Sequence, residues 1–131
     1  MAKDDLDLVV HLGDYIYEGN HSSKHRSTDY SAPETYTIDD YRNRYALYKL
    51  DTDLQAAHPN FPWMVTFDDH KVDNNWAVEV PQDSEKQSRK NFLERRAIAF
   101  QAYYENMPLR RTSLPNIYPI EKFDIENVHL H

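Results

Sequence analysis

Residues 5–19 of the chain, with the sequence DLDLVVHLGDYIYEG, decide the class of fold. The apolar run at 6–12 predicts a short strand buried on both faces, and this run ends directly at Gly13. A second apolar, β-prone run, WMVTF at 63–67, is followed at once by DDH at 68–70. Because helical sequence separates the two runs, they predict an α/β fold with a parallel pair of strands.

Two helical regions are expected, one between these runs and one after them. Thr37 followed by Asp40 resembles a capping box, which places the start of the first helix, and Asp51 is expected to cap a second, short one. Asp83 or Ser84 is expected to cap a longer helix. Apolar residues spaced three and four apart predict the buried face of each helix. In the first helix this face is formed by Tyr41, Tyr45 and Tyr48. In the long helix it is formed by Leu93, Ala97, Phe100, Tyr104 and Met107.

The arginines of the long helix and the last apolar run of the sequence each lead to a further prediction. Arg89, Arg95 and Arg96 of the long helix are expected on a solvated face with neighbouring glutamates, the alternative being that one of them reaches a substrate phosphate. Residues 123–130 predict one more strand of the sheet.

Composition limits the function. The 131 residues include 22 Asp and Glu against 15 Lys and Arg, and this net charge of -7 argues against sequence-independent nucleic-acid binding, which needs a basic surface. The sequence has no cysteine, so disulfides, cysteine zinc sites and thiol catalysis are excluded. No run approaches the ~18 apolar residues of a membrane span. The length fits about one domain.

Acidic side chains follow both predicted strands. In a parallel sheet, ligands bind beyond the carboxyl ends of the strands, so Asp14 and Asp69 are expected to face one crevice. Two carboxylates there repel each other, and a divalent or trivalent cation removes that penalty. Tyr17, three residues after Asp14, can turn its phenolate to the same ion. A strand that ends in Gly-Asp is also common as a turn or a helix cap, so each motif alone leaves a purely structural interpretation open.

Three stretches together resemble the PhoD-like alkaline phosphatases and phosphodiesterases. They are residues 5–19, residues 41–75 (YRNRYALYKLDTDLQAAHPNFPWMVTFDDHKVDNN) and residues 95–110 (RRAIAFQAYYENMPLR). The resemblance implies a calcineurin-like metallophosphoesterase fold, an α/β sandwich of two sheets flanked by helices. It also implies that residues 1–131 are a partial PhoD-like metallophosphatase domain, truncated at both ends.

The resemblance further implies a metal centre with a ferric ion and calcium ions. Asp14 in the pattern GDxxY is expected to bridge the metals, and Tyr17 is expected to bind the ferric ion through its phenolate oxygen. Asp69 stands where related phosphoesterases have the Asn of an Asn-His pair, a ligand of a second metal. Asn74 or Asn75 is expected to offer an amide oxygen to a calcium-like ion. Oxygen ligands of this kind suit both ferric iron and calcium.

The implied reaction is hydrolysis of phosphate monoesters or diesters. His70 is the expected catalytic residue, either stabilising the phosphoryl oxygens or protonating the leaving group. Lys71 follows it where the family usually has Glu, and is expected either to alter the surroundings of the site or to place an ammonium near it. The resemblance also suggests an exported protein, periplasmic or extracellular.

An incomplete domain is expected to have little activity alone and to self-associate through exposed sheet edges. The alternative function is a non-catalytic fragment or remnant with at most weak metal binding.

Overall fold

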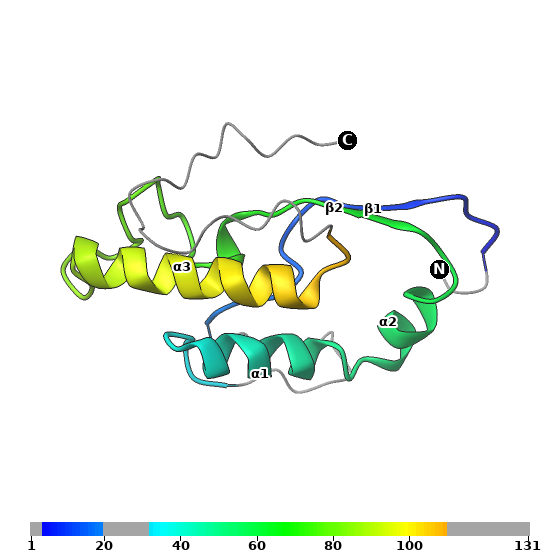
Figure 1. Cartoon of the computed structure of the whole chain (residues 1–131), viewed down its shortest axis with the longest axis horizontal. Coiled ribbons are helices and arrows are strands. Elements are labelled where there is room, and N and C mark those ends of the chain that lie inside the picture. The colour runs from blue at the N-terminus through cyan, green and yellow to red at the C-terminus, as the bar shows by residue number, and fades with distance from the viewer. Residues whose placement is uncertain (1–3, 20–31, 110–131) are drawn as a thin grey trace.

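The computed structural model describes residues 4–19 and 32–109. Strand β1 (Val9–His11) is followed by helices α1 (Ile38–Tyr48) and α2 (Thr52–Ala57), strand β2 (Trp63–Val65), the 3-10 helix η1 (Asp69–Lys71) and helix α3 (Arg89–Asn106). In Figure 1 the two strands run side by side, and α3 lies between them and α1. This mixed order of strands and helices is compatible with the predicted α/β class. The strand predicted at residues 123–130 lies outside the described residues.

The two strands form the predicted parallel pair. β1 pairs with β2 in parallel, with Val10 opposite Met64 and His11 opposite Val65. Each strand is shorter than the apolar run that predicted it. Val65 is buried, whereas Val10 and Met64 on the other face are 53% and 52% exposed. The sheet is therefore covered on one face only within the described residues, and its open face is apolar.

Local capping fixes where the first two helices begin. The Thr37 hydroxyl accepts a hydrogen bond from Asp40 N at 3.2 Å, and the Asp40 carboxylate accepts one from Thr37 N at 2.8 Å, which confirms the predicted capping box. Asp51 caps α2 by accepting from Leu54 N at 2.9 Å. The tyrosines at 41, 45 and 48 are buried as predicted.

Helix α3 begins later than predicted. Its N-cap is Ser88, because Asp83 caps a separate turn: Asp83 O accepts from Gln87 N at 3.0 Å, and the Asp83 carboxylate accepts from Glu85 N at 3.1 Å.

The buried face of α3 is turned by about one residue from the predicted face. Phe100 and Met107 are buried as expected, but Leu93, Ala97 and Tyr104 are only partly buried, and the fully buried apolar positions of the helix are Phe92, Ala99 and Ala102.

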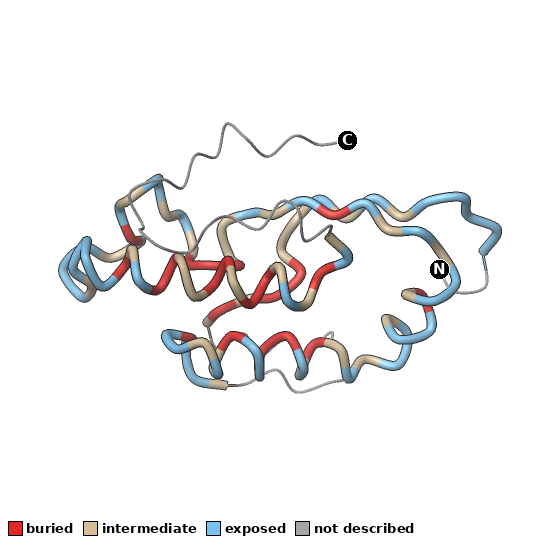
Figure 2. Tube along the Cα trace, viewed as in Figure 1, coloured by how far each residue is buried: buried red, intermediate tan, exposed pale blue. Residues whose placement is uncertain are grey.

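The core lies where α1 packs against α3. Figure 2 shows buried residues along the facing sides of these two helices. Tyr41 and Tyr45 are fully buried, and Tyr15 from the segment after β1 stacks on Tyr45 with ring centroids 6.0 Å apart. Phe67, after β2, meets Phe100 edge to face at 5.5 Å. The segments that follow both strands are thus anchored in the same aromatic core.

The prediction that the arginines of α3 are solvated is wrong for two of them. Arg95 and Arg96 are 3% and 7% exposed, and only Arg89 is exposed. Arg96 donates to the carbonyl oxygen of Val78, and the partners of Arg95 are described below. No helix in the described part of the chain has the length and apolarity needed to span a bilayer.

Candidate metal centre

A glycine lets the ends of the two strands approach each other. Gly13 has a φ of +116°, and a Cβ placed on it would lie 2.6 Å from Asp68 Cβ and 2.8 Å from Asp68 N. Any side chain at this position would therefore strain the backbone and force the segments after β1 and β2 apart. Asp14 follows with a φ of +50°, which turns the chain away from the strand direction.

This close approach brings three predicted site residues together. Ligand atoms of Asp14, Asp69 and His70 all lie within 4.8 Å of one another. Asp14 comes from the turn after β1, whereas Asp69 and His70 come from η1 after β2. Tyr17 lies at the same place, since its hydroxyl is 3.5 Å from Asp14 Oδ2 and its ring centroid is 4.4 Å from that of His70.

The electrostatics of Asp14 favour a cation. Burial, the largest cause, raises the pKa of Asp14; contact with His70 opposes this rise, and the nearby carboxylates of Asp68 and Asp69 add to it. Its Oδ1 atom is buried and has no hydrogen-bond partner among the described residues. An unpartnered carboxylate oxygen beside a second carboxylate is a ligand set that suits a hard cation, so the residues present fit a metal ion here.

Asp69 is held in place by its own loop. Its Oδ1 accepts from His70 N at 2.9 Å, and its Oδ2 accepts from Asn75 N at 2.6 Å. Asn75 has a φ of +53°, a left-handed conformation that asparagine tolerates better than most residues. Asn74 makes its hydrogen bond through its backbone N–H, so its role as a metal ligand stays a prediction.

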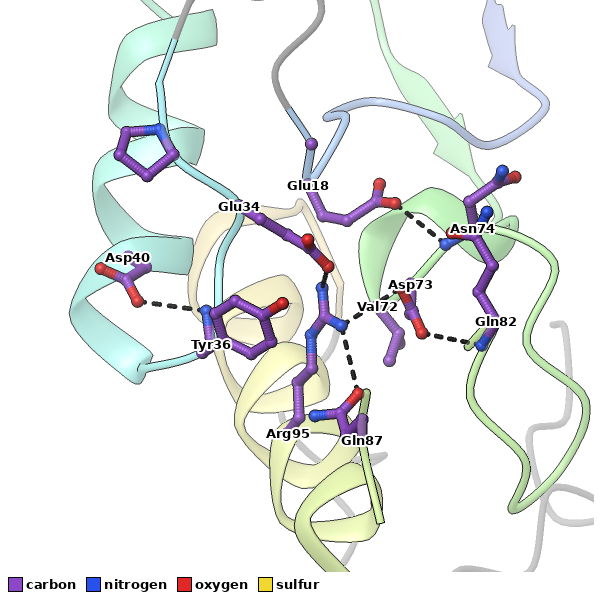
Figure 3. Close-up of polar contacts among 12 residues, drawn as sticks. Glu18, Glu34, Tyr36, Asp40, Val72, Asp73, Asn74, Gln82, Gln87 and Arg95 are labelled. Atoms are coloured by element: carbon purple, nitrogen blue, oxygen red, sulfur yellow. Dashed lines mark hydrogen bonds and ion pairs between the residues drawn. The ribbon is translucent and has the colours of Figure 1, made fainter. Parts of the chain in front are cut away.

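Glu18 is a further residue of the site, and no pattern in the sequence singles it out. This side chain is 4% exposed, its Oε2 lies 2.8 Å from His70 Nδ1, and its Oε1 accepts from Asn74 N at 2.9 Å (Figure 3). It closes the same GDYIYE motif that carries Asp14 and Tyr17. No spacing rule separates a buried glutamate in this place from a solvated one, so the only available signal was its position in that motif.

Arg95 ties α3 to the loop that follows the site. Its guanidinium lies 3.1 Å from Asp73 Oδ1 and 2.9 Å from Glu34 Oε1, and it also donates to Gln87 Oε1 at 3.3 Å (Figure 3). Asp73, itself 4% exposed, accepts from Gln82 N at 3.0 Å. A buried charge needs such partners, and they explain why this arginine does not lie on a solvated face.

Lys71 does not reach into the cluster through a polar contact. It is 2% exposed, and its ammonium lies 3.1 Å and 3.3 Å from the ring centroids of Phe67 and Phe100. Its Nζ has no hydrogen-bond partner among the described residues. Of the two expectations for Lys71, an altered surrounding or an ammonium near the site, these contacts therefore favour the first, through packing against Phe67 and Phe100.

The arrangement can do two kinds of chemistry. The oxygen atoms of Asp14, Tyr17 and Asp69 can hold a metal ion, and the imidazole of His70 can exchange a proton with a group bound beside it. These side chains come from two segments of the chain and lie close together, as the sequence predicted for Asp14 and Asp69.

Comparison with known proteins gives consistent matches. The model of a family described as PhoD-like phosphatase matches residues 1–122. Alkaline phosphatase D of Bacillus subtilis (strain 168) is 52% identical over 120 residues, which are 88% of this chain and 20% of that protein. A solved structure titled "Structure of PhoD" matches with a TM-score of 0.78 and 53% identity, covering 88% of this chain and 22% of that one. The chain thus spans far less than half the length of these relatives.

Proposed function

Because the chain belongs to the PhoD-like phosphatase family, we propose that its Asp14–Asp69–His70 cluster is part of a metal-dependent centre that hydrolyses phosphate esters. The observation that carries this proposal is the convergence of these side chains, from two separate segments, to within 4.8 Å of one another. Their chemistry, two carboxylates and an imidazole, suits metal-assisted hydrolysis.

Three side chains are proposed to hold the metal. Asp14 offers the buried Oδ1 that lacks a hydrogen-bond partner among the described residues, and Asp69 and Tyr17 add a carboxylate and a phenol close beside it. A bound metal would supply positive charge against the phosphate and lower the pKa of a bound water. Following the family resemblance, we propose ferric iron and calcium as the ions, with the Asn74 carboxamide as a further ligand.

His70 is proposed to act on the substrate. Its side chain is mostly buried, with its Nδ1 held against Glu18 and its ring against that of Tyr17. A histidine so oriented can stabilise the phosphoryl oxygens or donate a proton to the leaving oxygen. The substrate is a phosphate monoester or diester.

The chain is proposed to supply one part of a larger catalytic domain. The relatives are several times longer, since the chain covers 20% of one and 22% of the other. The apolar open face of the β1–β2 sheet is suited to a further layer, such as the second sheet of a calcineurin-like sandwich, or to association with another copy. Export to the periplasm or the cell exterior is proposed from the family resemblance alone.

A hydrolysis assay tests the proposal. The protein is stripped of metal, reconstituted with ferric iron and calcium, and assayed with p-nitrophenyl phosphate and with bis(p-nitrophenyl) phosphate. We expect hydrolysis to appear only after metal is restored, to be weak in this chain alone and stronger when the rest of the proposed domain is supplied, and to be lost in Asp14→Asn. The matched control is Asp39→Asn, because Asp39 is 81% exposed and pairs only with Arg42 in the described part of the chain.

Two results would count against the proposal. Activity that survives in Asp14→Asn would remove the cluster from the reaction. Metal binding with no hydrolysis of either ester, even when the rest of the proposed domain is supplied, would favour the alternative, a non-catalytic remnant of the family.

A further inference from the structure

Glu18 is a buried carboxylate with two engaged oxygens. It is 4% exposed, so nearly all of its hydration is lost on folding, and a carboxylate so placed requires specific hydrogen-bond partners. Oε2 lies 2.8 Å from His70 Nδ1, and Oε1 accepts from Asn74 N at 2.9 Å. Each oxygen is thus committed to a different segment of the candidate metal centre.

The backbone that carries Glu18 is held on both sides. Arg44 donates to the carbonyl oxygen of Tyr17 and, at 2.7 Å, to that of Gly19. The carbonyl oxygen of Glu18 itself accepts from Thr35 N at 3.2 Å. Arg44 is 3% exposed, so this support belongs to the interior of the fold. The carboxylate therefore projects from a fixed point.

Contact with Glu18 determines which nitrogen of His70 carries a proton. An ionised carboxylate only accepts hydrogen bonds, so the hydrogen between Glu18 Oε2 and His70 Nδ1 belongs to Nδ1. In a neutral imidazole, Nε2 then bears the lone pair. With Nδ1 committed, the lone pair on Nε2 of a neutral His70 can bind a metal ion, whereas donation to a phosphoryl or leaving oxygen requires the imidazolium form, in which Nε2 also carries a proton.

The second oxygen of Glu18 acts on the neighbouring carboxylate. It accepts from the backbone N–H of Asn74, and the next N–H, that of Asn75, donates to Asp69 Oδ2 at 2.6 Å. The same short stretch of backbone therefore touches Glu18 at one residue and orients Asp69 at the next. One carboxylate reaches both His70 and, through this stretch, Asp69.

We propose that Glu18 is a positioning residue that holds His70 in its Nδ1–H tautomer and fixes the backbone that orients Asp69. The proposal depends on the proposed function only for the role of His70 in the reaction. The geometry concerns the protein alone, so it can be tested without metal or substrate.

The test records the ring nitrogens of His70 in the metal-free full chain by ¹⁵N NMR after histidine labelling, with His70→Gln to assign the signal. The parent is expected to show the Nδ1–H tautomer. The variant is Glu18→Gln. A carboxamide has one accepting oxygen, whereas both partners of Glu18 need an acceptor, so only one of them can be satisfied. We therefore expect Glu18→Gln to lose either the Nδ1–H tautomer or the slow hydrogen exchange of the Asn74 amide.

The control is Glu34→Gln. Glu34 carries the same charge and also lies near the loop, but it is 43% exposed and pairs with Arg95 at 2.9 Å. This variant should keep both the tautomer and the protected Asn74 amide. In reconstituted protein we expect Glu18→Gln to lower kcat by about tenfold or more, with a smaller change in KM, since it disturbs positioning rather than substrate binding.

The outcomes separate the two proposals. A parent ring that carries its proton on Nε2 alone overturns the positioning role without any variant, and so does a Glu18→Gln protein that keeps both NMR signatures. A lowered melting temperature with both signatures intact would show a merely structural role. Absence of hydrolysis in every protein even when the rest of the proposed domain is supplied, together with the expected NMR changes, would refute the proposed function and leave the positioning role standing.

Discussion

Gly13→Ala is the substitution that most sharply tests how the site is built. The backbone of Gly13 has a φ of +116°, and a residue with a side chain in this conformation is strained by on the order of 1–3 kcal/mol. The added Cβ would also lie 2.6 Å from Asp68 Cβ, and forcing extra atoms into such a packed contact costs about 1–3 kcal/mol. The sum, about 2–6 kcal/mol, is a large part of the roughly 5–15 kcal/mol that stabilises a typical domain.

Two measurements follow from this estimate. Urea unfolding should show the loss in the free energy of unfolding. A metal titration of the folded variant should show weaker binding, because the segments that carry Asp14 and Asp69 are pushed apart. Leu12→Ala is the control: it introduces the same residue at the preceding position, where the side chain is 78% exposed, and should change stability by about 0.5 kcal/mol or less. If Gly13→Ala matches Leu12→Ala in both measurements, the close approach of the strand ends is not what assembles the site.

Three further predictions concern the supporting structure. Thr37→Ala should lower the free energy of unfolding by about 1 kcal/mol because it removes the capping box of α1, and an unchanged denaturation midpoint would contradict this. Lys71→Met should raise the free energy of unfolding by about 1–2 kcal/mol, because it replaces a buried amine that lacks a hydrogen-bond partner among the described residues. A decrease of that size in the free energy of unfolding would instead show that the contacts of Lys71 with Phe67 and Phe100 dominate. Burial raises the pKa of the Tyr41 hydroxyl to about 12 in the folded protein, above the unfolded value of 10.0. Between these two values the folded state holds the proton more tightly, so the contribution of Tyr41 to stability should be constant below pH 10 and fall as the pH rises towards 12, by on the order of 2–3 kcal/mol. The fall in the free energy of unfolding between pH 10 and pH 12 should be shallower in Tyr41→Phe than in the parent. Equal slopes in the two proteins would contradict the raised pKa of Tyr41.

Features governed by neighbouring residues were predictable from the sequence. The capping box of Thr37 and Asp40 and the buried tyrosines of α1 depend on side chains within one helix, and both predictions are confirmed. The parallel pairing of β1 with β2 followed from two apolar runs separated by helical sequence. The meeting of Asp14 and Asp69 followed in turn, because parallel strands end on the same side of a sheet.

Features that depend on distant partners were not predictable. Arg95 looked like a solvated residue, and its burial rests on Asp73 and Glu34, which other segments bring to it. Glu18 looked like any other acidic residue, and its importance arises from contacts with His70 and Asn74, more than fifty positions away in the sequence. Asp83 does cap a turn, as its residue type suggested, but this turn is separate from α3, whose N-cap is Ser88.

The sandwich predicted from the family resemblance needs more sheet than these residues supply. The described residues contain a two-stranded sheet with one apolar face uncovered. A sheet of two strands is marginal by itself, and burial of its second, apolar face requires further strands or a covering layer. The long relatives that the chain matches are consistent with this requirement.

The metal content of the purified protein tests the central claim most directly. The chain is incubated with ferric iron and calcium, freed of unbound ions, and analysed by elemental mass spectrometry beside Asp14→Asn and Asp39→Asn. The structure predicts that the parent and Asp39→Asn retain metal in a fixed ratio to protein, and that Asp14→Asn loses it, because Asp14 supplies the buried oxygen of the cluster that has no hydrogen-bond partner in the described part of the chain. Equal metal content in all three folded proteins would contradict the assignment of Asp14, Asp69 and His70 as a metal centre.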